Sequence, residues 1–250
     1  MAGHSKWAQI KRKKAVTDSR RGKLWTKLLK EVTVAARIGG PDPGGNPRLR
    51  VAIQEAKAAN CPNGNIDRAI KRGSGLIDGA SYEEVVYEGY GPGGVAILVE
   101  TLTDNRNRTV AELRHVLAKS GGNLGESGCV AWMFDKRGIF ALEGNALSED
   151  EFMEIALDIG AEDAAVEEGV YEIYSAPEEY AAVRDAIEAR GLGVTSQALA
   201  MLPKNTVDVD VETAGRVLKL VDALEDQDDV QNVWSNLNVT DELLATLETG

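Results

Sequence analysis

The 250-residue sequence has few of the residues that build covalent or metal-based frameworks. It contains two cysteines, Cys61 and Cys129, and two histidines, His4 and His115. Two cysteines exclude a disulfide scaffold and suit a reducing cytosol, so we expect a cytoplasmic protein. Two histidines that stand far apart in the sequence do not give the ligand spacing of a metal site. We therefore expect no metal.

Long apolar runs are also missing. No segment approaches the roughly 18 consecutive apolar residues of a membrane-spanning helix. The N-terminus is basic and lacks the apolar core of a secretory signal. We expect no membrane partner and no signal peptide.

Acidic residues outnumber basic residues over the chain as a whole. Lys and Arg number 28 against 40 Asp and Glu, which gives a net charge of −12. Taken alone, this value argues against nucleic-acid binding, because an acidic protein repels polyphosphate.

The charge is, however, divided very unevenly along the chain. Residues 1–75 contain 17 basic and five acidic residues, a net charge of +12. The remaining 175 residues contain 11 basic and 35 acidic residues, a net charge of −24. Such an asymmetry indicates that the basic part contacts nucleic acid.

The basic stretch is predicted to be helical. Ser5 is placed to cap a first helix. Asp18 or Ser19 is placed to cap a second helix, which ends at Gly39–Gly40. Asn46 is placed to cap a third helix, which has Pro47 at its first position. Asn65 is placed to cap a short fourth helix. The second helix has an apolar arc (Leu24, Leu28, Val32 and Ala35) opposite a cationic one.

A cationic helix face is often only a solvated face, but here acids that could neutralise it are nearly absent. Clustered Lys and Arg neutralise phosphates and release counterions. Trp7 could stack on bases, whereas Trp25 lies on the apolar arc and is expected in the core. The candidate nucleic-acid-binding residues, with two arginines from a later polar segment, are Lys6, Trp7, Lys11, Arg12, Lys13, Lys14, Arg20, Arg21, Lys23, Lys27, Lys30, Arg37, Arg106 and Arg108.

From about residue 82 the pattern changes to alternating strands and helices. A hairpin is predicted with its turn at Gly89–Gly94, and further strands at Cys129–Phe134, Gly138–Leu142 and Val230–Val239. Residues 138–202 give the order strand, helix, two strands, helix, strand, which is ferredoxin-like. The fold class is therefore predicted as α+β.

No catalytic constellation emerges, and we expect neither an enzyme nor a cofactor. Gly89–Gly94 lacks the Gly-Lys-Ser/Thr ending of a phosphate loop and leads into a strand. His115 and Cys129 are expected in surface and core roles, not as a nucleophile–base pair. Asp226–Asp229 is expected to be a helix-exit turn. Thr103–Thr109 is open to two interpretations, a helix cap or an extension of the binding surface through Arg106 and Arg108.

Several motifs closely resemble the YebC/PmpR family over the whole length. They are Ala2-Gly3-His4-Ser5-Lys6-Trp7, Arg21-Gly22-Lys23, Gly39-Gly40-Pro41-Asp42-Pro43, Asn46-Pro47-Arg48-Leu49-Arg50, Asn65-Ile66-Asp67-Arg68-Ala69-Ile70, Tyr87–Gly94 and Leu102–Thr109. Trp25 stands where the family more often has Phe, and Cys61 where it often has Met; both keep an apolar side chain.

The resemblance implies an N-terminal all-helical domain followed by two ferredoxin-like α/β domains, the third inserted in the second. We expect a basic helical domain at 1–75, a discontinuous domain at 80–134 plus 206–246, and the inserted domain at 135–205.

The resemblance also implies two functions. Bacterial members of the family are described as regulators that bind promoter DNA. Members are also placed on the ribosome, relieving stalls at proline-rich sequences, and a mitochondrial relative is a translational activator. In the ribosomal case we expect the basic domain to bind ribosomal RNA. The first hypothesis is a DNA-binding transcriptional regulator and the alternative is a ribosome-associated translation factor. A third class, a pure protein-interaction module, predicts no nucleic-acid affinity. The oligomeric state is left open.

Overall fold

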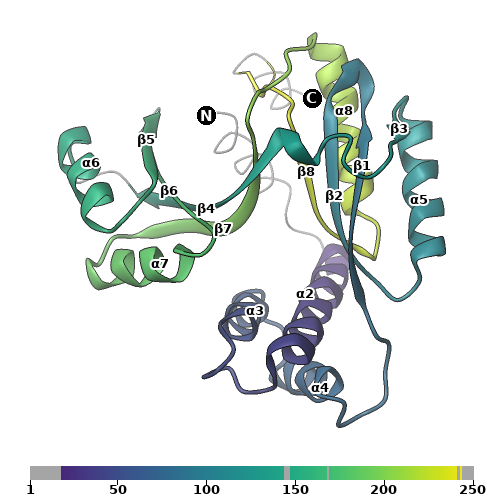
Figure 1. The fold of residues 1–250 in the computed structure, drawn as a ribbon, viewed down its shortest axis with the longest axis horizontal. Helices are drawn as coiled ribbons and strands as arrows, with labels where there is room; N and C mark the ends of the chain where they lie inside the picture. The colour runs from purple at the N-terminus through teal and green to yellow at the C-terminus, as the bar shows by residue number, and fades with distance from the viewer. Residues whose placement is uncertain (1–17, 144–146, 168, 241–242, 244–250) are drawn as a thin grey trace. The chain divides into compact units, whose positions relative to one another are not determined.

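The computed structural model describes residues 18–143, 147–167, 169–240 and 243 (Figure 1). These residues form two compact units. One, called here the basic-end unit, contains 18–129 and 210–235. The other, the inserted unit, contains the described residues of 130–209 together with 236–240 and 243.

The basic-end unit begins with three helices, α2 (Asp18–Gly39), α3 (Pro47–Ala58) and α4 (Asn63–Gly73). Their apolar faces share one core that includes Val32, Ala35, Leu49 and Ile66, with Trp25 packed against it. The Trp25 indole donates to the carbonyl of Ala59 at 2.9 Å. The expected core role of Trp25 is confirmed.

Asn46 joins the end of α2 to the start of α3, as its place before Pro47 predicts. Its side-chain oxygen accepts a hydrogen bond from the Leu49 N–H at 3.1 Å. Its side-chain nitrogen donates to the carbonyls of Ala35 and Gly40, both at 2.8 Å. One buried amide therefore satisfies backbone groups at both helix termini.

The same unit contains an antiparallel sheet in the order β3-β1-β2-β8. Its elements are β1 (Glu83–Tyr90), the 3₁₀ turn η1 (Pro92–Gly94), β2 (Ala96–Thr103), α5 (Arg106–Lys119), β3 (Asn123–Leu124), α8 (Val211–Glu225) and β8 (Val230–Ser235). The predicted hairpin is confirmed, and Gly93 and Gly94 adopt φ of 73° and 74° in its turn, a conformation that glycine adopts without strain. The central strand β2 is buried on both faces over Ala96–Val99.

The inserted unit has the predicted ferredoxin-like element order. It runs η2 (Ala131–Met133), β4 (Phe134–Glu143), α6 (Glu149–Asp158), β5 (Asp163–Glu167), β6 (Val170–Ser175), α7 (Tyr180–Ala189) and β7 (Val194–Pro203). The sheet order is β5-β6-β4-β7, all pairs antiparallel. Phe140 and Ile173 share a core with Phe152 of α6 and Val183 of α7, so both helices cover one sheet face. The predicted α+β class, with this unit inserted in the chain of the other, is confirmed.

Three local predictions are wrong. Cys129–Phe134 is not a strand, because Ala131–Met133 is a 3₁₀ turn. Strand β4 instead begins at Phe134 and continues through the polar Asp135–Arg137. Within this stretch Asp135 pairs with Lys204 and Arg137 pairs with Glu162. The fourth helix begins at Asn63 after Pro62, without a side-chain cap at Asn65. The last strand ends at Ser235, short of Val239. The predicted first helix from Ser5 lies outside the described residues.

Candidate nucleic-acid interface

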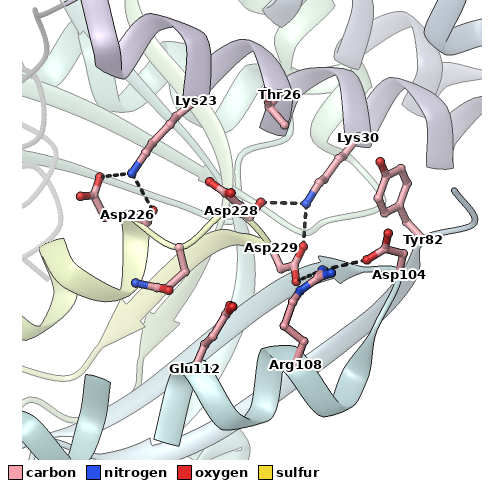
Figure 2. Close-up of a pocket in the computed structure, with 11 residues that line it drawn as sticks. Lys23, Thr26, Lys30, Tyr82, Asp104, Arg108, Glu112, Asp226, Asp228 and Asp229 are labelled. Atoms are coloured by element: carbon pink, nitrogen blue, oxygen red, sulfur yellow. Dashed lines mark hydrogen bonds and ion pairs between the residues drawn. The ribbon is translucent and has the colours of Figure 1, made fainter. Parts of the chain in front are cut away.

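The predicted cationic face of α2 lies against an acidic corner of its own unit. This acidic corner is Glu225–Asp229, the last residue of α8 and the four residues before β8. Lys23, Lys27 and Lys30 recur at intervals of four and three residues, which puts them on one side of the helix. All three ammonium groups contact oxygen atoms of the acidic corner (Figure 2 shows Lys23 and Lys30).

The two outer contacts are partly open to solvent. The Lys23 Nζ donates to the Asp226 carbonyl at 3.1 Å and lies 3.5 Å from its carboxylate; the two side chains are 48% and 66% exposed. Lys27 donates to the carbonyl of Glu225. These carbonyls belong to the C-terminal end of α8, where the helix dipole is negative and lysine is a favourable partner.

Lys30 is different, because it is buried. Its residue is 7% exposed, and its Nζ lies 2.7 Å from the Asp229 carboxylate and 2.8 Å from the Asp228 carbonyl. The ammonium also lies 5.3 Å from the centre of the Tyr82 ring, within cation–π range. In this structure Lys30 is thus a structural residue, and its ammonium is not presented to solvent.

Asp229 accepts hydrogen bonds from three elements, one of them β2 through the Thr103 hydroxyl at 3.2 Å. Besides Lys30, its carboxylate accepts hydrogen bonds from Arg108 at 2.6 Å and from the Thr109 hydroxyl at 2.8 Å, both on α5. Burial opposes ionisation of this carboxyl, but the hydrogen bonds from Arg108, Lys30 and Thr109 outweigh it and lower the pKa of Asp229 to about 2. Asp229 therefore holds α2, α5 and the start of β8 together as a carboxylate.

The segment Thr103–Thr109 is primarily a helix cap. The Asn105 side chain accepts from the Arg108 N–H at 3.1 Å, and the Thr103 hydroxyl accepts from the Asn105 N–H at 2.9 Å. The Arg108 guanidinium also pairs with Asp104 at 2.7 Å. The two carboxylates raise the pKa of Arg108, so it stays charged. Of the two interpretations of this segment, the capping role has direct support.

A cavity of about 650 Å³ lies between α2 and the acidic corner (Figure 2). It is lined by Lys23, Thr26, Lys30, Tyr82, Asp104, Arg108, Glu112, Asp226, Gln227, Asp228 and Asp229. Five carboxylates face three cations here, and Lys30 and Arg108 already share Asp229. The cavity is therefore acidic on balance and does not suit a small anion.

The other predicted residues are dispersed. Arg37 donates to the Ser81 hydroxyl at 2.6 Å and to the Tyr82 carbonyl, at the far end of α2. Arg106 forms an exposed ion pair with Glu83 at 2.7 Å. Arg20 and Arg21 lie in the first turns of α2, and their side chains are outside the described part. Lys6, Trp7, Lys11, Arg12, Lys13 and Lys14 lie outside the described residues.

The cations that α3 and α4 expose are not among the predicted binding residues. Arg50 and Lys57 on α3, and Arg68 and Lys71 on α4, are solvent-exposed. No ion pair joins any of these four to a described acid. Their exposure could have been anticipated, because they alternate with the buried Leu49, Ala52, Ile66 and Ala69 at helical spacing.

The described residues offer no reactive centre. His115 is exposed on α5, and burial raises the pKa of the Cys61 and Cys129 thiols, which disfavours the nucleophilic thiolate. Among the described residues no group of three His, Cys, Asp or Glu could hold a metal ion. No described helix has the length and apolar character needed to cross a membrane.

Two family domains match almost the whole chain. The TACO1/YebC N-terminal domain matches residues 5–76, and the TACO1/YebC second and third domain matches residues 82–237. The chain belongs to the TACO1/YebC family. The first domain match covers all three described helices of the basic end, and the second covers both sheets.

Relatives in this family carry regulatory names. A "probable transcriptional regulatory protein" of Desulfotalea psychrophila is 55% identical over 99% of both chains, and one of Halothermothrix orenii is 58% identical over 98% of both. The crystal structure of a conserved hypothetical protein from Aquifex aeolicus is 49% identical and has a TM-score of 0.81, covering 91% of this chain and 94% of its own. The chain is thus a member of a regulator family.

Proposed function

We propose that this protein is a cytoplasmic, non-enzymatic DNA-binding transcriptional regulator that binds nucleic acid through its basic N-terminal domain. The observation that carries the proposal is the charge division, +12 over residues 1–75 and −24 over the rest. The basic end has the net charge that attracts a polyanion, whereas the acidic remainder repels one. The names of the relatives support regulation of transcription.

The phosphate contacts are assigned to two groups of cations. The first is the N-terminal run Lys11, Arg12, Lys13 and Lys14. The second is the exposed set Arg50, Lys57, Arg68 and Lys71 on α3 and α4, whose charges have no acidic partner among the described residues. Phosphate contacts of this kind position a protein on nucleic acid without selecting a sequence.

A second candidate is a ribosome-associated translation factor that binds ribosomal RNA and relieves stalls at proline-rich sequences. The observation favouring it is that the described basic helices expose cations but no aromatic side chain that could stack on bases, since Trp25 is half-buried. It is the one aromatic residue between 18 and 75, and it packs in the core, so this stretch offers no aromatic side chain for stacking on bases. A cationic surface of this kind suits recognition of RNA shape as well as of promoter DNA.

The salt dependence of binding tests the proposal. The double variant Arg68→Ala/Lys71→Ala removes two exposed cations from α4, so log K against log salt for a labelled DNA duplex should flatten by about 2. Replacing Lys11, Arg12, Lys13 and Lys14 with Ala should flatten it by up to about 4. The matched control is Arg114→Ala/Lys219→Ala, which removes two exposed cations from the acidic part.

The outcomes separate the hypotheses. If log K fell with log salt at the same slope for the α4 variant, the N-terminal variant and the control, the basic domain would be excluded as the binding surface. Absence of any binding to DNA or RNA at physiological salt would leave a protein-interaction module. Sedimentation of lysate with and without nuclease decides the target: nuclease-sensitive comigration with ribosomes favours translation, and a sequence-specific DNA shift in competitor favours transcription.

A further inference from the structure

We propose that the acidic corner Glu225–Asp229 is a built-in competitor of nucleic acid for the lysines of α2. Phosphates that bind on α2 displace Lys23 and Lys27 from the acidic corner, while Lys30 remains paired with Asp229. This inference rests on the proposed function, because it adds Lys23 and Lys27 of α2 to the cations that contact phosphate and says what holds them when no nucleic acid is bound.

The acidic corner offers α2 the same chemistry that a phosphate backbone offers. The three lysines are met by a row of oxygens: the carbonyls of Glu225, Asp226 and Asp228 and the carboxylates of Asp226 and Asp229. A phosphodiester likewise presents anionic oxygens at regular intervals. An ammonium group engaged by the acidic corner cannot contact a phosphate with the same protons, so the two ligands compete.

The contact between α2 and the acidic corner is weak and exposed at Lys23 and strong and buried at Lys30. At the Lys23 end the ion pair is long, 3.5 Å, and both side chains are about half exposed or more. Exposed pairs of this kind contribute little and are weakened by salt. At the Lys30 end the pair is 2.7 Å long, and its side chains are 8% and 3% exposed, so breaking it would leave two buried charges unpaired. A polyanion therefore displaces the contact from the Lys23 end and leaves the Lys30 end as an anchor.

Zero-length crosslinking of the intact protein tests this displacement. A carbodiimide joins an ammonium to a carboxylate only when the two groups touch, and both Lys23 and Asp226 are accessible to it. Peptide mass spectrometry then measures the Lys23–Asp226 amide with and without a saturating DNA duplex that has 5′-hydroxyl ends. The control pair is Lys204–Asp135 in the inserted unit, 3.2 Å apart and 44% and 48% exposed.

We expect the duplex to lower the Lys23–Asp226 crosslink severalfold and to leave Lys204–Asp135 unchanged. Asp226→Asn should strengthen binding of the duplex by about twofold to fivefold, the size of one exposed ion pair. Glu154→Gln, which removes one exposed carboxylate from α6, controls for the change in net charge.

The possible negative results have different meanings. If a gel shift shows the duplex bound while the Lys23–Asp226 crosslink is unchanged, the acidic corner is a permanent clamp and only this inference fails. If neither DNA nor RNA binds at physiological salt, the proposed function fails and the inference fails with it. Equal affinities of Asp226→Asn and Glu154→Gln would also overturn the competition.

Discussion

The Lys30 ammonium lies 2.7 Å from the Asp229 carboxylate, although the two residues stand 199 positions apart in the sequence. Lys30 belongs to the basic end and Asp229 to the acidic part that follows the inserted unit. The pair thus joins the two oppositely charged regions of the chain inside one compact unit. It also converts part of the predicted binding face into an internal contact.

Replacing Asp229 with Asn is expected to destabilise the basic-end unit strongly. The variant leaves the buried Lys30 ammonium without its counter-charge and weakens the contacts of Arg108 and Thr109. Removing one partner of a buried ion pair costs about 3–5 kcal/mol. Urea unfolding, followed by tryptophan fluorescence, to which Trp25 and Trp234 of this unit contribute, measures the change in the free energy of unfolding.

The control for this variant is Asp226→Asn, which removes a carboxylate from the same acidic corner. Its partner Lys23 is about half exposed, so the cost should stay below about 1 kcal/mol. Similar losses for the two variants would contradict the distinction between a buried anchor and a weak outer contact.

Acid should remove the contribution of Asp229 over a defined range of pH. The pKa of this carboxyl in the folded protein is about 2, against an ordinary value of 3.8. Because the folded value is the lower one, the stabilisation is complete above about pH 4.5 and is lost as the pH falls towards 2. The shift corresponds to about 2 kcal/mol.

Unfolding of the wild type and Asp229→Asn between pH 6 and 2.5 checks this expectation. The difference in the free energy of unfolding should be constant down to about pH 4.5 and shrink below it. A difference that stays constant to pH 2.5 would mean that Asp229 does not titrate in this way.

Much of the fold could be predicted from local chemistry. The cap at Asn46, the glycine turn at Gly93–Gly94 and the order of elements in the inserted unit follow from turn residues and hydrophobic periodicity. Cys129–Phe134 was predicted as a strand, yet Ala131–Met133 is a 3₁₀ turn, and β4 runs instead through the polar Asp135–Arg137. Pairing of β4 with β7 overrides that local polarity.

The candidate site was less predictable, because it depends on a contact between distant segments. Lys30 and Lys23 are equivalent by helical periodicity, yet one is buried and the other exposed. The difference comes from Asp229, which the sequence marks only as part of a helix-exit turn. Charge complementarity between a basic helix and an acidic turn indicates attraction, but it does not say which of several acidic turns lies opposite.

Two glycines of α4 should respond to alanine in opposite directions. A Cβ at Gly73 would lie 2.2 Å from the Thr33 carbonyl oxygen and 2.8 Å from the Ala36 Cβ, so α4 must move away from α2. We expect Gly73→Ala to destabilise by about 1–3 kcal/mol. A Cβ at Gly64 meets nothing within 4 Å, so Gly64→Ala should stabilise by about 0.5–1 kcal/mol through helix propensity. Thermal unfolding measures both, and equal shifts would contradict the close approach of the two helices.

Substitutions at Asn46 test whether one amide serves two helix termini. Asn46→Ala removes the acceptor for the Leu49 N–H and the donors to the Ala35 and Gly40 carbonyls, at a site that is 4% exposed. A lost cap together with unsatisfied carbonyls should cost about 2–3 kcal/mol. Asn46→Asp keeps the acceptor that caps α3 but directs a carboxylate at the same two carbonyls.

At neutral pH Asn46→Asp should therefore be destabilised at least as much as Asn46→Ala, although Asp is as good a helix cap as Asn. Lowering the pH should recover part of its stability, because the protonated carboxyl donates one hydrogen bond to a carbonyl. Calorimetry of both variants at pH 7 and pH 4 separates the two roles. If Asn46→Asp matched the wild type at pH 7, capping of α3 alone would account for the residue, and the bonds to the end of α2 would contribute nothing.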